Sequence, residues 1–145
     1  MEQEKINALA KFLEVETNEI TEGVYDNDAL AYGNQEYLVL TNEQADAKAK
    51  EEIEYSLWAF NTDFIIQHCK NFEKMDIYEI EAAEKSLRCA QENCCENANG
   101  LVFALIDNME EFVEDAINAD GRGHFISRYD GVENEQDGFY IYRMD

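Results

Sequence analysis

A regular apolar spacing in the middle of the chain predicts a long amphipathic helix. Six apolar residues follow one another at intervals of 3, 3, 4, 3 and 4: Ile77, Ile80, Ala83, Leu87, Ala90 and Cys94. These intervals place the side chains on one face of an α-helix. Asp76 precedes this stripe and Glu79 follows three residues later, a pairing typical of a capping box. We therefore expect a helix that begins after Asp76 and turns this stripe inward.

Helical patterns also occupy four other segments of the sequence. The first covers residues 2–14, and the second begins at Thr41, whose pairing with Gln44 predicts a capped helix to about residue 60. A shorter helix is expected from Thr62, and another after Gly100. The residues expected to face inward on the first helix are Ile6, Leu9 and Leu13, and on the second Ala45, Ala49, Ile53 and Leu57. On the third they are Ile65, Ile66, Cys69 and Phe72, and on the fourth Val102, Leu105, Met109, Phe112 and Ala116.

Two short apolar segments have the composition of β-strands. They are residues 37–41 (YLVLT) and 139–143 (FYIYR), and residues 124–127 (HFIS) are a third candidate, whereas residues 17–35 have the composition of turns. The 145 residues contain no proline and no linker-like stretch. We therefore predict a single acidic globular domain over residues 1–145. Its expected class is α+β, mostly helical, with a small antiparallel or mixed sheet.

The charge of the chain excludes several classes of function. Asp and Glu number 33 against 11 Lys and Arg, giving a formal net charge of −22, while 46 % of the residues are hydrophobic. So much apolar sequence is typical of a folded protein and not of an acidic disordered tail. Direct binding of nucleic acid or of an anionic membrane is not expected, because both require cationic surfaces. With no signal-peptide pattern and no membrane-length apolar run, a cytoplasmic location with reduced cysteines is expected.

Acidic residues are gathered into two long windows that contain no Lys or Arg. Nine acids lie between Phe12 and Ala47, and eight lie between Cys89 and Gly121. On the helix expected after Gly100, like charges stand four residues apart three times, and each such pair costs a helix about 0.2–0.5 kcal/mol. This cost favours a functional acidic face that binds a partner. Its candidate residues are Asp107, Glu110, Glu111, Glu114 and Asp115, together with Glu14, Glu16, Glu19, Glu22, Asp26 and Asp28.

A surface of this kind is able to imitate nucleic acid. Duplex DNA carries one negative charge per ~1.7 Å of its axis, so 22 charges correspond to about 37 Å, or roughly eleven base pairs. Carboxylates three and four residues apart on a helix lie ~4.5–6 Å apart along its axis. The predicted partner is a protein with a basic, nucleic-acid-binding surface. The alternative is an acidic coat on a binding protein unrelated to mimicry; adaptation to high salt is less consistent with the excess of Glu over Asp.

No metal site or cofactor is predicted. Residues 116–127 resemble a calcium loop at Asn118, Asp120 and Gly121, but Ala116 and Ser127 replace its first and last carboxylates. Cys89, Cys94 and Cys95 lack the spacing of zinc ligands. We interpret the cysteines as core or bystander thiols, with Cys69 and Cys94 on apolar stripes.

One Gly-rich segment near the C-terminus offers a candidate for catalysis. It contains Asp120, Gly121, Arg122, Gly123, His124, Tyr129, Asp130 and Gly131. His124 with Asp120 or Asp130 is a possible general base, which leaves a small enzyme as the alternative function. However, no nucleophile elbow, Walker loop or dinucleotide fingerprint is present. We therefore interpret the segment as structural, with arginines that bond carboxylates and glycines at positive φ, and we predict no catalytic residue.

The same segment carries a resemblance to a protein family. DGRGHFISRYDG and GFYIYR near the C-terminus, with EYLVLTNEQAD and SLWAF upstream, resemble small acidic proteins of uncertain function encoded by tailed phages and prophages. The resemblance covers the two ends of the chain better than its Cys-containing middle, and it carries over no catalytic residue. It implies action in the host cytoplasm, where compact anionic phage proteins block restriction or CRISPR nucleases. The predicted function is a non-enzymatic inhibitor or modulator of a nucleic-acid-processing protein.

Overall fold

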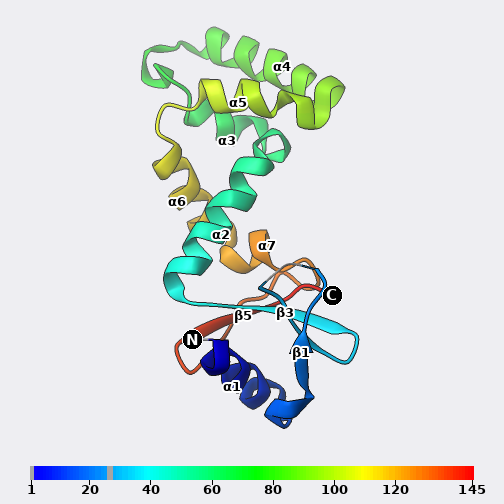
Figure 1. Cartoon of the computed structure of the whole chain (residues 1–145). Helices are drawn as coiled ribbons and strands as arrows, with labels where there is room; N and C mark the ends of the chain where they lie inside the picture. Colours follow the sequence, from blue (N-terminus) through cyan, green and yellow to red (C-terminus); the bar gives the residue numbers. More distant parts are fainter. Residues whose placement is uncertain (1, 26–27) are drawn as a thin grey trace. The chain divides into compact units, whose positions relative to one another are not determined.

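The two strands expected from the sequence are neighbours at the centre of the sheet (Figure 1). In the computed structural model, which describes residues 2–25 and 28–145, β3 (Gln35–Leu40) pairs antiparallel with β5 (Phe139–Arg143). Their register sets Val39 opposite Ile141 and Leu38 opposite Tyr142. All four of these side chains are buried, so the pairing closes an apolar layer between segments about a hundred residues apart. Both segments that the composition indicated are therefore strands.

Three shorter strands complete an antiparallel sheet in the order β1-β2-β3-β5-β4. They are β1 (Ile20–Glu22), β2 (Leu30–Tyr32) and β4 (Asn134–Gln136). Polar residues dominate both edge strands, which protects the edges from pairing with other chains. The turn between β4 and β5 has positive φ at Asp137 and Gly138, the geometry that suits a two-residue hairpin. The class is α+β and mostly helical, as predicted.

The chain divides into two compact units, and the first contains the sheet. It comprises Met1–Lys50 and Ala119–Asp145. Helix α1 (Glu2–Leu13) packs on one face of the sheet, where Leu9 and Ala10 join Ile20, Leu30, Tyr37, Val39 and Ile141 in one buried cluster. The first turns of α2 (Asn42–Tyr55) and the short helix α7 (Arg122–Ile126) belong to the same unit. The expected strand at residues 124–127 is wrong, because Ser127 N donates to the Gly123 carbonyl and closes a helical turn there.

The second unit, Glu51–Asn118, is helical. Its helices are α3 (Thr62–Gln67), α4 (Ile77–Cys94), α5 (Asn99–Leu105) and α6 (Met109–Asp120), with short 3₁₀ turns η2 (Leu57–Ala59), η3 (Phe72–Lys74) and η4 (Cys95–Ala98); another 3₁₀ turn, η1 (Thr17–Glu19), lies in the first unit. The unit boundaries fall within α2 and α6.

Helix α4 begins at the predicted capping box, in which Asp76 accepts from Glu79 N and Glu79 accepts from Asp76 N. The capping box of Thr41 and Gln44 is confirmed as well.

Helix α3 stops at Gln67, before the expected inward positions Cys69 and Phe72, and two further helices also end earlier than the sequence indicated. Helix α2 stops at Tyr55 because the Asn99 side chain donates to the Glu54 carbonyl at 2.6 Å and accepts from Trp58 N at 3.0 Å. The helix expected over residues 101–116 is two helices. Ile106 between them is extended and forms a β-bridge with Cys69, while Asn108 accepts from Glu111 N at the start of α6. Both breaks depend on contacts with segments distant in the sequence.

The apolar stripe of α4 is only partly covered, and its two end residues, Ile77 and Cys94, are exposed. Of the residues of α4, all of which the structure describes, Leu87 alone is buried, and Ile77 is 65 % exposed. Cys94 is exposed, so its assignment to a buried stripe is wrong, and Cys89 and Cys95 are exposed too. Cys69 is partly buried and its Sγ donates to the Ile65 carbonyl. The helical spacing was correct, but the unit supplies too few neighbours to bury the whole stripe.

Candidate functional site

Helix α6 presents the acidic residues on the side opposite its apolar stripe. Phe112, Val113 and Ala116 are buried, which turns Glu110, Glu111 and Glu114 outward. These three residues, the α6 acidic face, are exposed and form no ion pair among the residues that the structure describes. Their negative charge is therefore available to a partner.

Asp107 lies outside the helix that was expected to carry it. It is in the connection between α5 and α6, where its backbone N–H donates to the His68 carbonyl at 2.9 Å. The expected repulsion between Asp107 and Glu111 along a helix is therefore absent. Two like-charged pairs remain on α6, Glu110 with Glu114 and Glu111 with Asp115.

Asp107 and Glu111 line a hollow of about 340 Å³ in the helical unit. We call it the acidic hollow; its acidic and basic wall residues are Glu73, Asp107, Glu111, Lys74 and His68. Three carboxylates against one ammonium leave the hollow negative at neutral pH. It is concave, so a long cationic side chain from another protein would enter it with its apolar stem covered.

His68 binds Asp115 at the base of this region. Its Nε2 lies 3.2 Å from Asp115 Oδ2, and its side chain is 12 % exposed. The ring also packs against Phe64 and Phe112, which hold it in place. Asp115 is therefore partly engaged within the unit and is a weaker candidate for a partner contact than Glu110, Glu111 and Glu114. Sequence reasoning missed this pair, because 47 residues separate its members and no motif marks it.

The acidic residues of the N-terminal window lie in the unit that contains the sheet. Glu14, Glu16, Glu19, Glu22 and Asp28 are exposed, and Asp26 lies outside the described residues. Glu16 and Glu19 form a capping box at η1, so these two carboxylates also hold the chain. The predicted face therefore consists of one group of residues in each unit.

Glu36, which the sequence did not single out, is the buried carboxylate of the same window. It is 8 % exposed and accepts hydrogen bonds from Val24 N at 2.7 Å and Tyr25 N at 2.9 Å. These bonds compensate for its burial and fix the chain that follows β1. The strand that carries it, β3, is buried on both faces.

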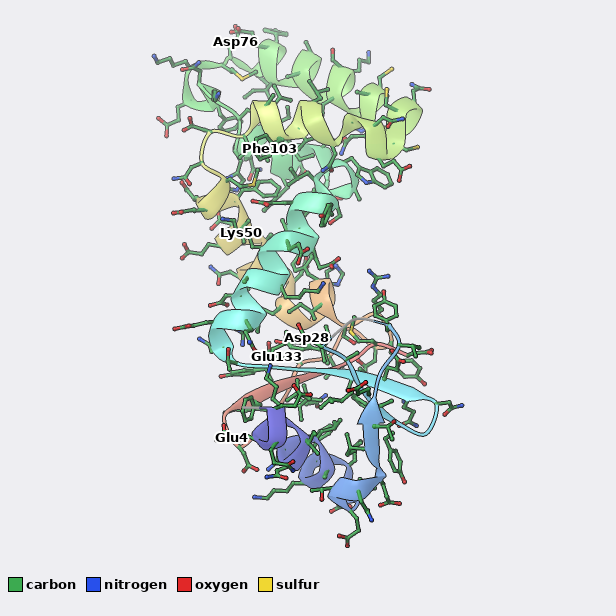
Figure 2. The ribbon with its side chains drawn as sticks, viewed as in Figure 1. Glu4, Asp28, Lys50, Asp76, Phe103 and Glu133 are labelled. Carbon is green, nitrogen blue, oxygen red and sulfur yellow. The ribbon has the colours of Figure 1, made fainter. Side chains whose placement is uncertain are left out.

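Arg122, on α7, is the centre of a polar network in the unit that contains the sheet. Its guanidinium, 11 % exposed, binds Glu133 at 2.8 Å and Asp46 at 3.0 Å, and it lies over the Tyr140 ring. Burial works against its charge, but the hydrogen bonds to Glu133 and Asp46 more than compensate, so the pKa of Arg122 lies above its ordinary value. Tyr142 also donates to Glu133, which is labelled in Figure 2. The network engages the Nε and Nη1 donors of Arg122 and joins α7 to α2 and to the chain before β4.

His124, the candidate general base, lies on α7. It is exposed on α7 and contacts the ring of Phe125, and within the described residues no hydrogen bond joins it to Asp120 or Asp130. Asp130 instead accepts from Ser127 Oγ at 2.9 Å and from Val132 N at 3.1 Å. Of the two carboxylates that the enzyme alternative offers, Asp130 is therefore engaged with Ser127 and Val132.

The remaining residues of this segment shape its turns. Gly121 and Gly131 have φ of 85° and 68°, so the predicted positive φ values are confirmed. Gly123 matters for a different reason, because a Cβ there would lie 2.7 Å from the Gly131 carbonyl oxygen. Arg143 stacks on the Tyr129 ring, and Arg128 stacks on the Tyr25 ring. Asp120 is exposed at the end of α6.

Comparisons with known proteins give no relative: no family model, no curated protein and no solved structure matches the chain. Among residues 2–25 and 28–145, no group of three or more His, Cys, Asp or Glu side chains is placed to hold a metal ion. In the same part of the chain, no helix combines the length and the apolar character that crossing a bilayer requires.

Proposed function

We propose that the chain is a non-enzymatic acidic protein that binds a basic surface on a nucleic-acid-processing protein. The observation that carries this proposal is the α6 acidic face, whose three exposed carboxylates have no ion-pair partner in the described chain. An ordinary surface helix recovers repulsion energy with interleaved lysines. Here the repulsion is retained, which is understandable if a partner supplies the positive charge.

The form of binding that we propose is occupation of a nucleic-acid groove. The net charge of −22 matches that of roughly eleven base pairs of duplex, and the resemblance to small phage proteins suggests a restriction or CRISPR nuclease as the target. The partner is to be captured from a bacterial lysate at low salt and released above ~0.5 M salt, where charge is screened.

The first prediction concerns the α6 acidic face. Changing Glu110, Glu111 and Glu114 together to Gln should weaken binding of the captured partner by about tenfold at low salt, as measured by titration calorimetry. Stability should stay the same or rise, because like-charge repulsion on the helix is relieved. A matched control replaces Glu2, Glu4 and Glu135, which are exposed and lie outside the predicted face, with Gln; this removes equal charge from the other unit. Equal affinities of wild type and the α6 variant would remove this helix from the interface.

Competition with duplex DNA separates mimicry from general acidic binding. A mimic of the duplex displaces labelled DNA from the partner, with an affinity that falls steeply with salt. A stable ternary complex at saturating protein would contradict groove occupancy. The variant His124→Ala tests the enzyme alternative. We expect its affinity for the partner to stay within a few-fold of wild type. If the variant instead lost a measurable catalytic turnover while keeping its fold, that result would favour the enzyme.

A further inference from the structure

The helical unit contains an apolar groove in addition to its acidic surface. The groove has a volume of about 340 Å³, and its apolar wall residues include Ile66, Met75, Leu87, Leu101 and Leu105, with Cys69 and Lys70 beside them. Its wall residues come from α3, α4 and α5 and from the connection between α3 and α4, and the three helices are neighbours in Figure 1. A cavity of about 150 Å³ holds one benzene ring, so this groove has room for about two large apolar side chains.

The α5 side of this groove is unusually poor in charge for this chain. Residues 97–106 contain no charged residue, and on α5 the exposed positions are Gly100, Leu101, Phe103 and Ala104. Leu101 is 45 % exposed and Phe103, labelled in Figure 2, is 59 % exposed. Exposed apolar surface in a helix that could have carried charge marks an interaction site in soluble proteins.

The groove and the acidic hollow share a wall. Cys69 lines both, and its bridge with Ile106 holds residues 68–70 against residues 105–107. At one end of this wall His68 and Asp107 face the hollow, and at the other end Lys70 and Leu105 line the groove. The two residues of extended chain from His68 to Lys70 span about 6.8 Å, which separates the hollow from the groove. Residues i and i+4 of a helix are ~6 Å apart along its axis. Two such residues of a bound helix would therefore match the spacing of the hollow and the groove.

We propose that this composite site binds an amphipathic helix of a partner protein, with its apolar residues in the groove and a Lys or Arg in the acidic hollow. Charge complementarity selects this occupant. The unit from Glu51 to Asn118 contains 16 Asp and Glu against four Lys and Arg, so it repels a second copy of itself and attracts a cationic helix. Apolar anchors at i and i+4 beside a basic residue are the pattern of helix-in-groove recognition. The inference rests on the proposed function, to which it adds the kind of partner segment.

The probe is a fluorescein-labelled synthetic helix of Leu and Lys, titrated with the full chain and followed by anisotropy. We expect a 1:1 complex, with at least tenfold weaker binding of a second peptide whose apolar-face leucines are serines and whose lysines are kept. Leu101→Ser should weaken binding of the Leu peptide by about tenfold. Ile77 is also an exposed apolar residue, but it lies outside the groove. The variant Ile77→Ser should therefore bind the Leu peptide with an affinity within about twofold of wild type.

The acidic hollow is tested with the double variant Asp107→Asn, Glu111→Gln, which should weaken binding by about fivefold at low salt and have little effect at high salt. Equal binding of the Leu and Ser peptides, or equal losses in the Leu101 and Ile77 variants, would overturn the groove while leaving the proposed function intact. A groove effect without any effect of the double variant would contradict the cationic partner, and with it the proposed function. A dimer of the free chain that Leu101→Ser dissolves, seen by sedimentation, would make a second copy the occupant and overturn the inference.

Discussion

At the scale of single residues, Tyr142 shows what the buried network contributes to the fold. Its ring is buried, it donates to Glu133, and Arg122 binds the same carboxylate. Burial, and then the hydrogen bond and charge of Glu133, raise the pKa of Tyr142 above its usual value. Burial likewise raises the pKa of Tyr37. Both hydroxyls therefore stay protonated in the folded chain at pH values where they ionise in the unfolded chain.

This difference predicts a loss of stability at alkaline pH. The unfolded chain begins to lose its tyrosine protons at pH ~10, before the folded chain does, so unfolded molecules bind fewer protons. The free energy of unfolding is therefore unaffected below pH ~9 and falls above pH ~10, by up to about 1.4 kcal/mol per pH unit for each such tyrosine. Urea titrations between pH 8 and 11 should show a shallower slope for Tyr142→Phe. Tyr78→Phe, whose ring is 79 % exposed, should keep the wild-type slope.

Gly123 and Gly100 form a matched pair of glycines with opposite expected effects. A Cβ at Gly123 would lie 2.7 Å from Glu133 N and from the Gly131 carbonyl oxygen, whereas nothing lies within 4 Å of a Cβ at Gly100. Backbone atoms cannot yield as a flexible side chain does, so Gly123→Ala should lower the free energy of unfolding by about 2–4 kcal/mol. Gly100→Ala, at the start of α5, should raise it by up to about 1 kcal/mol. Thermal melts followed by circular dichroism measure both, and equal effects would contradict the predicted clash.

At the scale of elements, the sequence was informative where local rules act alone. The capping boxes before α2 and α4 and the composition of β3 and β5 depend on neighbouring residues, and each predicted its element correctly. The three-residue strands were missed because they are too short and polar to show alternation, and they are strands only through their partners. The segment at residues 124–127 has strand composition, but Gly123 allows it to close as a helical turn.

The candidate site was predictable only in part, because some of its features depend on contacts with segments distant in the sequence. Exposure of Glu110, Glu111 and Glu114 followed from the apolar stripe of Phe112 and Ala116. The acidic hollow did not, because it depends on the bridge between Cys69 and Ile106, which breaks an otherwise continuous helical pattern. Periodicity detects which face of a helix is apolar, but not whether a distant strand-like contact interrupts that helix.

The cap of α4 gives a prediction at this scale. Asp76→Ala removes the oxygen that accepts from Glu79 N at 2.8 Å, and an N-cap of this type is worth about 1 kcal/mol. Because α4 buries only Leu87, little packing compensates, and the N-terminal turns of α4 should fray. Hydrogen exchange of the first α4 amides should accelerate in this variant. Glu81→Ala, exposed in the same helix, should leave exchange unchanged, and equal protection in all three proteins would show that the cap is dispensable.

At the scale of the whole molecule, the excess of carboxylates has opposite consequences for folding and for binding. Among the described residues, ion pairs use carboxylates such as Asp46, Glu133 and Asp137, while most acids face solvent. Folding brings these charges together, and their mutual repulsion opposes the compact state. The proposed complex with a basic partner depends on the same charges being unscreened. One variable, ionic strength, therefore acts on both equilibria.

Raising NaCl from 20 mM to 0.5 M should increase the Tm of the free chain by about 3–6 °C, since screening weakens the repulsion. Over the same range the affinity for the captured partner should fall by at least a hundredfold, as expected when several cations are neutralised. The triple variant of the α6 acidic face should show a smaller change in both quantities, because it carries three fewer charges. Calorimetric melts and anisotropy titrations at matched salt provide the measurements. A Tm that rises while affinity stays constant would assign the charge to solubility alone, and would leave apolar contacts such as those of Leu101 to carry any binding.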